Sequence, residues 1–265
     1  MAGSSLAAPS LFSEQETLIQ NIARLAPFIP SLLRASLINI QLLIGLIALG
    51  YVFGTLTALL QVYGGKILGT VARIYEWIFR SVPALVLLFL FYYGPPRFGI
   101  GISGFAAAMF ALGFRSSAYQ SQIFRGAIQS IPSGQMLAAR SMGMSRIQAI
   151  FSIILPQAFR LSIPGWTNEF SSVIKDTTLA YAVGFNEVLR TARIVYDTHY
   201  DLAMSVLIFV ALIFMVLTLA GNALMGGVER RFRIPGLQVP GHEKTRQSSR
   251  TSSDSWGLRL RNFWR

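Results

Sequence analysis

Two long stretches of the chain carry no charged side chain. Residues 35–65 contain no Asp, Glu, Lys or Arg, and neither do residues 202–228. A bilayer core about 30 Å thick requires about 20 apolar residues in a helix. Both stretches exceed that length, so each predicts a membrane-spanning helix. Only 13% of the 265 residues are charged and 53% are hydrophobic, which is too little charge to cover a soluble domain of this size.

The net charge of +12 is concentrated near the predicted helix ends and in the C-terminal segment. This distribution is typical of positive-inside orientation and of contact with anionic lipid, rather than of nucleic-acid binding. Cysteine is absent, which excludes disulfides, thiolate catalysis and cysteine metal ligands. With two histidines, His199 and His242, no metal site is expected.

Turn residues and charges divide the chain into about five predicted transmembrane helices. The expected spans are 32–62, 74–93, 102–124, 161–185 and 202–228. The fourth is disputed because it contains Glu169, Lys175 and Asp176, and hydropathy alone allows four spans or five. Five are favoured because the basic segments 66–73 and 125–160 then share the cytoplasmic side with the Arg-rich tail.

This pattern predicts three regions. Residues 1–30 form an N-terminal extracytoplasmic lead-in, residues 31–237 the transmembrane domain, and residues 238–265 a basic cytoplasmic tail. The tail is rich in Ser and Arg, so we expect it to be disordered. Residues 186–201 are expected to form an outer loop.

The segment 125–160 is too polar to span a membrane and too apolar for a plain loop. It predicts a short helix over 134–142 capped by Ser133, a hinge at Gly143, and a second helix that starts at Met144 and Ser145 and ends near Pro156. A short helix held between glycine and proline breaks is suited to dock into a groove of a partner. The coupling segment is therefore defined as residues 132–156.

The coupling segment resembles that of ABC importer permeases. Their pattern is Glu-Ala-Ala, three residues, Gly, nine residues, Ile, one residue, Leu-Pro. The matching positions here are Ala138-Ala139, Gly143, Ile153 and Leu155-Pro156. Further matches resemble the polar amino acid branch: Gly134-Gln135, Pro156-Gln157-Ala158, Arg80-Ser81-Val82-Pro83, Ala118-Tyr119, Arg125-Gly126, Asn168-Glu169-Phe170 and Lys175-Asp176-Thr177-Thr178-Leu179. Two positions depart from the family. Leu137 replaces the Glu of the triplet, and Gln122 replaces an acidic residue before Arg125.

The resemblance implies the all-α type I ABC importer permease fold, in a multi-pass protein of the inner membrane with a cytoplasmic C-terminus. It implies a permease subunit that couples ATP hydrolysis by a partner to uptake of polar amino acids. The implied partners are ATP-binding subunits holding ATP and Mg²⁺, a second permease subunit, an extracytoplasmic solute-binding protein and membrane lipid. The chain itself has no Walker-type loop and no nucleophile–base set, so no cofactor and no enzymatic activity are expected in it.

The family also implies which residues transmit the ATPase motion. They are Gln135, Leu137, Ala138, Ala139, Gly143 and Ser145. Because Leu137 cannot form the ion pair that the family's Glu commonly makes with the ATPase, docking here is expected to depend on packing, backbone contacts or a compensating change in the partner.

Glu169 is the leading candidate for substrate binding. A carboxylate at bilayer depth costs about 2.5–3.5 kcal/mol on insertion scales, so it is expected to face a cavity or a partner. With Asn168 beside it, Glu169 suits the ammonium group of an amino acid. The alternative is an ion pair with Lys175 or Arg115 that only holds helices together.

Four further residues are candidates for the substrate pathway. Lys175 can contact a substrate carboxylate or pair locally with Asp176. Thr177 can offer a hydroxyl or bond its own helix backbone, and Tyr119 can line the pathway or only pack. Gln122 is expected to influence substrate charge preference if it faces the site. Arg80 and Glu76, four residues apart, are expected to form a structural pair.

Two other functions are consistent with a multi-span protein. An ion-gradient secondary transporter usually contains internal repeats and more spans, which are not evident here. A non-transporting scaffold that anchors a partner is the second alternative. The sequence leaves open which amino acid is carried, and whether the permease pairs with itself or with a paralogue.

Overall fold

The computed structural model describes residues 23–232, and every element within that range is helical. The all-α fold is therefore confirmed. The chain divides into two compact units, residues 1–229 and 230–265, and only the arrangement within the first is described. Most of the expected lead-in and the whole expected tail lie outside the described residues. The main helices are α2 (Ile29–Tyr63), α3 (Gly65–Ser81), α4 (Ala84–Tyr93), α5 (Gly104–Gln129), α6 (Ser133–Ser141), α7 (Arg146–Ala149), α8 (Leu155–Asp176), α9 (Val188–Thr198) and α10 (Ala203–Phe232).

Short turns connect several of these helices. Four are 3₁₀ turns, η1 (Ala26–Phe28), η2 (Pro95–Phe98), η4 (Thr177–Val183) and η5 (Tyr200–Leu202), and η3 (Ile150–Ile154) is a π-helical turn.

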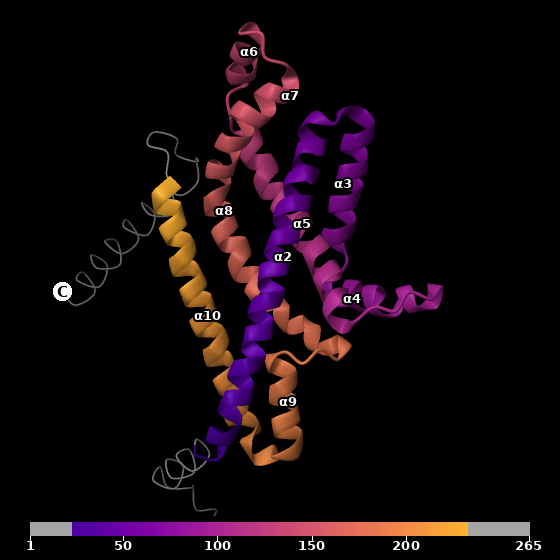
Figure 1. Cartoon of the computed structure of the whole chain (residues 1–265), viewed down its shortest axis with the longest axis vertical. Coiled ribbons are helices and arrows are strands. Elements are labelled where there is room, and N and C mark those ends of the chain that lie inside the picture. The colour runs from indigo at the N-terminus through magenta and orange to yellow at the C-terminus, as the bar shows by residue number, and fades with distance from the viewer. Residues whose placement is uncertain (1–22, 233–265) are drawn as a thin grey trace, which may run out of the picture. The chain divides into compact units, whose positions relative to one another are not determined.

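The centre of the bundle is the packing of α2 on α5 (Figure 1). Three glycines of α2 allow the close approach. An added Cβ would lie 2.2 Å from Met109 Cε at Gly45, 1.9 Å from Gln120 Nε2 at Gly50, and 3.0 Å from the backbone oxygen of Ser117 at Gly54. Small residues at helix contacts allow close packing in membrane proteins.

The predicted span 74–93 is not one straight helix. The chain breaks between α3 and α4, and the segments Gly65–Ser81 and Ala84–Phe98 are bent by 104°. Pro83 lacks an N–H and forces the preceding Val82 into an extended conformation, with ψ 131°. The carbonyl of Pro83 accepts bonds from the next helix turn, so the break is partly satisfied. Segment 66–73, expected as a turn, is the start of α3.

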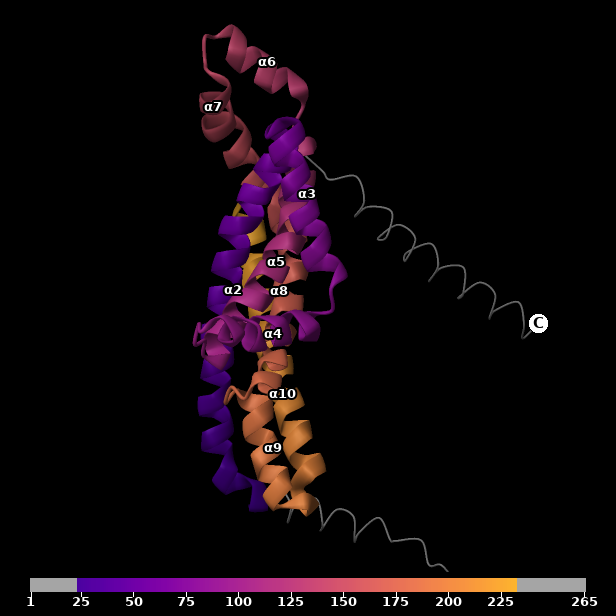
Figure 2. The ribbon, with the colours of Figure 1, turned by 90° about the vertical axis from the view of Figure 1, so that its right-hand side faces the viewer.

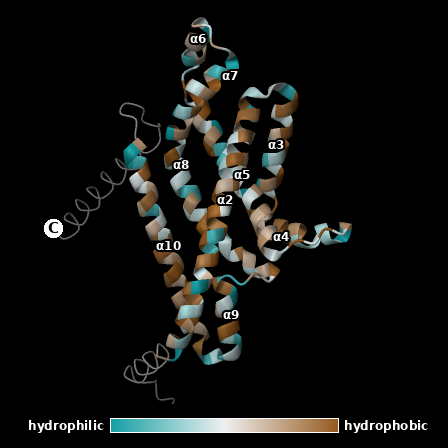
Figure 3. Cartoon of the chain, in the orientation of Figure 1, coloured by the Kyte–Doolittle hydropathy of each residue, from teal (hydrophilic) through white to brown (hydrophobic). Residues whose placement is uncertain are grey.

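Three helical segments are long and apolar enough to cross a membrane within the described range, Ala23–Tyr63, Arg146–Val183 and Tyr200–Phe232. The bent α3–α4 pair makes a fourth if it counts as one span, and Figure 3 shows the apolar surface of α2 and α10. The remaining expected span, 102–124, corresponds to α5. Its 26 residues extend about 39 Å, but Arg115 and several Ser and Gln side chains lower its hydropathy. The disputed stretch 161–185 is helical through Val183.

The two ends of the bundle differ in structure. α6 and α7 lie at the same end as the junction of α2 and α3, and α9 lies at the other end beside the start of α2 (Figures 1 and 2). The prediction of a loop over 186–201 is wrong for most of that range, because α9 occupies it. The side chain of Glu187 caps α9 by accepting bonds from the backbone N–H groups of Leu189 and Arg190.

Candidate functional site

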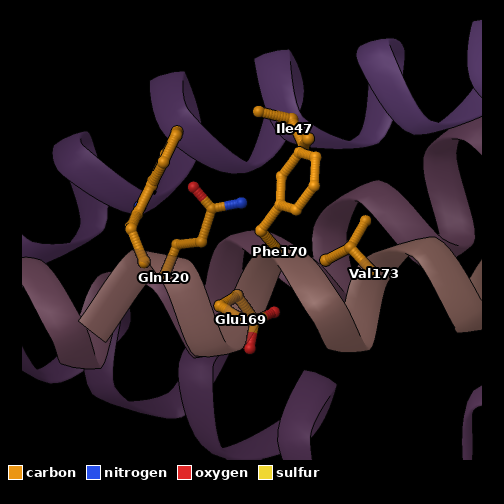
Figure 4. A pocket seen from close by; sticks show the side chains of 6 residues that line it. Ile47, Gln120, Glu169, Phe170 and Val173 are labelled. Carbon is orange, nitrogen blue, oxygen red and sulfur yellow. The ribbon is translucent and has the colours of Figure 1, made fainter. Parts of the chain in front are cut away.

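A small cavity lies where α8 meets α2 and α5. Its walls are Trp166, Glu169, Phe170 and Val173 of α8, Gln120 of α5 and Ile47 of α2 (Figure 4). Only about 10 Å³ of it is open to the centre of a water-sized sphere, whereas ligand pockets commonly enclose about 300–1,000 Å³. In this conformation the cavity is too small for an amino acid, so binding requires α8 to move away from α2 or α5.

Two polar atoms on residues lining the cavity have no hydrogen-bond partner among residues 23–232. They are Oε1 of Gln120, an acceptor, and Nε1 of Trp166, a donor. The Gln120 side chain is 2% exposed, and its Nε2 donates to Oγ of Ser116 at 3.0 Å. Buried polar atoms are nearly always satisfied in proteins. Because these two atoms have no partner, a polar ligand or a water molecule can bind to them.

Glu169 adds a carboxylate to the same cavity wall. Within the described part of the chain it forms no salt bridge, and Ser116, Arg115 and Asp176 are its polar neighbours. Arg115 is already committed, because its Nη1 donates to Oδ2 of Asp176 at 2.5 Å. The alternative that Glu169 forms a structural ion pair with Lys175 or Arg115 is therefore not what the structure contains, and Asp176 pairs with Arg115 rather than with Lys175.

Tyr119 lies between two guanidinium groups. The Cζ atoms of Arg80 and Arg115 are 5.2 Å and 4.9 Å from the centre of its ring. Arg80 also forms the expected pair with Glu76, at 2.6 Å. Cation–π contacts of this kind contribute about 0.5–2 kcal/mol each. Tyr119 therefore connects α3 to α5 beside the cavity, although it does not line it.

The other predicted substrate residues lie elsewhere. Asn168 and Lys175 are exposed on a face of α8 turned away from the cavity. Gln122 accepts a hydrogen bond from Arg125, on its own helix. Thr177 is 1% exposed and accepts a bond from Nδ2 of Asn39 at 3.1 Å. Of the six candidates, only Glu169 lines the cavity.

The coupling segment forms two short helices joined by a glycine. α6 begins at Ser133 and α7 at Arg146, and Gly143 between them has φ +85°, which favours glycine. Leu137 and Met142 are 69% and 84% exposed, and Ala138 is also exposed. Ala139 is 2% exposed and packs inward, so of the two alanines Ala138 is the one on the surface, and the coupling role of both stays a prediction.

The caps of the two helices differ from the prediction in one place. Ser145 caps α7 through a capping box, because its Oγ accepts from the Gln148 N–H at 3.2 Å and Gln148 Oε1 accepts from the Ser145 N–H at 2.8 Å. The expected cap by Ser133 is wrong, since Pro132 occupies the cap position of α6 and no side chain bonds there.

The coupling segment continues into α8 without the expected break. Pro156 lies in the first turn of α8, directly after the π-helical turn Ile150–Ile154. A proline removes one backbone donor and crowds the carbonyl four residues before it. One wider turn relieves that crowding and keeps the helix continuous, and such π turns are frequent at functional sites.

Residues 50–234 match the family of binding-protein-dependent transport system inner membrane components. The chain belongs to this family. The match includes the coupling segment, all of α3 to α9 and every cavity-lining residue except Ile47, and it covers more than two thirds of the chain. The protein is therefore the membrane-spanning permease subunit of an ABC transport system.

Curated relatives and solved structures agree with this assignment. The permease is 34% identical to the L-cystine transport system permease protein of Bacillus subtilis, over 69% of this chain and 78% of that protein. It is 34% identical to a probable glutamine ABC transporter permease protein of the same organism, over 72% and 88%. An amino acid ABC transporter structure with histidines matches with a TM-score of 0.71 at 32% identity, over 79% of this chain and 97% of that chain. An inward-facing methionine ABC transporter shares the fold, with a TM-score of 0.60 at 22% identity.

The sequence analysis missed two parts of the permease. Gln120 was not recognised as a lining residue, although Ser116, Ser117, Gln120 and Ser121 recur at helical spacing on a predicted span and indicate a buried polar face. The second is Asn39, which is buried, whereas Gln41, the other amide of residues 35–60, is exposed. Its Nδ2 donates to Thr177 and Glu187, both at 3.1 Å.

Proposed function

We propose that this permease imports a polar amino acid and that the cavity at Glu169 receives it. Three polar side chains line this cavity. The Glu169 carboxylate suits the substrate ammonium, Nε1 of Trp166 can donate to the substrate carboxylate, and Oε1 of Gln120 can accept from the ammonium. The observation that carries the proposal is that these groups sit on one cavity inside the membrane helices, with no salt bridge to Glu169 in the described residues. The printed names of the relatives, which refer to L-cystine and glutamine, support an amino acid as the class.

The proposed energy source is ATP hydrolysis in separate ATP-binding subunits that contact the coupling segment. The exposed side chains of Leu137, Ala138 and Met142 offer an apolar surface for that contact. This places α6, α7 and the C-terminus on the cytoplasmic side. The basic residues of segment 125–160 support that orientation. ATP and Mg²⁺ belong to the partner, and this chain supplies no nucleotide site.

A second permease subunit, identical or paralogous, is the proposed neighbour of α8. Asn168, Ser172 and Lys175 recur at spacings of four and three residues and are exposed in the single subunit. Polar side chains on a membrane-spanning helix usually face a protein neighbour or a water-filled path. An extracytoplasmic binding protein would deliver the substrate at the α9 end.

The test is uptake by the complete complex in proteoliposomes, with radiolabelled L-glutamine, L-cystine, L-arginine and L-glutamate as probes. Wild type should take up at least one of them only when ATP and the binding protein are present. Glu169→Gln should lower that uptake at least tenfold while the complex still assembles. Glu229→Gln, the same substitution near the end of α10, should leave uptake near wild type.

Three results would contradict the proposal. Uptake that continues without ATP indicates a gradient-driven transporter. A complex that takes up no amino acid under any condition indicates another substrate class or a scaffold. Uptake unaffected by Glu169→Gln places the binding site elsewhere. Deletion of residues 134–146 should abolish the stimulation of ATP hydrolysis by the binding protein, and stimulation that survives it would refute the coupling role.

A further inference from the structure

The short helix α6 makes few side-chain contacts with the rest of the permease. Only Ala139 of its residues is buried, and Met136 packs partly against the apolar cluster of Ile154 and Ala158. Among the described residues, one side-chain hydrogen bond joins α6 to a long helix, α8. Nε2 of Gln157, in the first turn of α8, donates to Oε1 of Gln135 at 2.6 Å.

The Gln157 side chain is held in place by two hydrogen bonds. An amide nitrogen carries two hydrogens, and the second is used at 2.9 Å by the carbonyl oxygen of Ile153. Ile153 belongs to the π-helical turn before Pro156. One hydrogen therefore fixes the Gln157 side chain to its own helix, and the other reaches across to α6. A side chain held at both ends transmits a displacement that a freely rotating one would absorb.

The far end of the same helix carries the cavity. Glu169 lies twelve residues after Gln157 on α8, about 18 Å along the helix axis. Both residues belong to α8, which stays helical across the Pro164 that lies between them, so a pull on its first turn shifts or tilts the wall that bears Glu169. As the cavity is too small for an amino acid in this conformation, such a shift of α8 is what opening requires.

We infer that Gln157 is a positioning residue for transport. Its bond to Gln135 passes the motion of α6 to α8 and so links ATP hydrolysis to the opening of the Glu169 cavity. The inference rests on the proposed function. It predicts that loss of the bond separates the two activities, so that ATP is hydrolysed with less transport for each ATP consumed.

The experiment compares amino acid uptake with ATP hydrolysis in the reconstituted complex, using the probe that wild type transports fastest. Gln135→Leu removes only the acceptor, and Gln157→Leu removes the donor. Each should lower the uptake per ATP about threefold to tenfold while ATP hydrolysis persists, the range expected for loss of one partly buried hydrogen bond. The double variant should be no worse than either single variant, because one shared bond is lost once. Gln129→Leu, on an exposed glutamine near the end of α5, is the matched control.

A covalent replacement provides the second measurement. The chain has no native cysteine, so Gln135→Cys/Gln157→Cys can be joined by a short reducible thiol-to-thiol crosslinker that spans the side-chain gap. Uptake per ATP should rise when the link is formed and fall again on reduction. The inference would be overturned if uptake per ATP is unchanged in the two single leucine variants and their double variant. It would also be overturned if crosslinking does not restore uptake per ATP. If wild type shows neither uptake nor ATP hydrolysis, the proposed function fails instead, and the two failures are distinguished by that control.

Discussion

Nη1 of Arg115 donates to Oδ2 of Asp176 at 2.5 Å, and this ion pair joins α5 to α8 one helix turn from the cavity residue Val173. Arg115 is thereby neutralised while its guanidinium lies over the ring of Tyr119. The pair leaves Glu169 as the carboxylate of this region without a salt bridge among the described residues. The structure thus separates two acids of one helix into a paired one and one open to a ligand.

Asp176→Asn should destabilise the permease, because it leaves the charge of Arg115 uncompensated among membrane helices. The two side chains are 23% and 27% exposed, so the cost should be about 1–3 kcal/mol, below that of a fully buried pair. Arg115→Gln/Asp176→Asn removes both charges and should recover part of the loss. Thermal unfolding of the purified protein in detergent measures this. A double variant as unstable as the sum of the single variants would show that the two residues are not coupled.

Trp166→Phe should separate binding from stability. The substitution removes Nε1, which has no partner among the described residues, and keeps most of the aromatic ring. Deleting an unsatisfied buried donor is nearly neutral for folding, so the unfolding temperature should stay within a few degrees. The substrate concentration for half-maximal uptake should rise severalfold if Nε1 contacts the substrate. A large loss of stability with unchanged uptake would make Trp166 a packing residue.

Gly54→Ala should weaken the packing of α2 on α5. The new Cβ would lie 3.0 Å from the Ser117 oxygen and 3.2 Å from the Ser121 nitrogen, both backbone atoms that cannot rotate away. Overpacking of this kind costs about 1–3 kcal/mol. Gly126→Ala is the control, because no heavy atom lies within 4 Å of its added Cβ. Equal unfolding temperatures for the two variants would contradict the close approach at Gly54.

The Glu187 carboxyl should make stability depend on pH. Burial raises its pKa above the usual 4.5, and the hydrogen bonds from Leu189, Arg190 and Asn39 oppose this only in part. A raised pKa in the folded state means that folding favours the protonated form, so this contribution to stability is full below about pH 4.5 and is lost as the pH rises through the raised pKa. Glu187→Gln cannot titrate and should flatten that decline. Unfolding temperatures measured from pH 4 to pH 8 test this, and parallel curves for both proteins would contradict it.

The helical membrane fold could be predicted because it depends on local composition. Uncharged runs long enough to span lipid leave the backbone few alternatives to a helix. The bend after Ser81 was also present in the sequence, since a proline restricts the residue before it. Hydropathy concealed it, because a window average passes over a break in direction.

The site could be predicted only in part. Glu169 was identifiable because a carboxylate within a span requires a reason to be there. Asn168 is its neighbour in sequence, but successive helix residues point about 100° apart, and only one of the two faces the cavity. The partner of Asp176 lies 61 residues earlier, on α5. That pairing depends on how α5 and α8 are rotated against each other, which close contacts such as Gly165 against Ile123 determine and which composition does not encode.

The exposed row of Asn168, Ser172 and Lys175 on α8 has a consequence for biogenesis. A newly inserted copy that stays alone presents an amide, a hydroxyl and an ammonium group to lipid, and such polar groups are costly within a membrane. Such a copy is unstable in lipid until another chain or water covers the row. Balanced synthesis of the subunits would then be needed for the permease to accumulate. A surplus copy would be exposed to membrane proteases through this uncovered polar row.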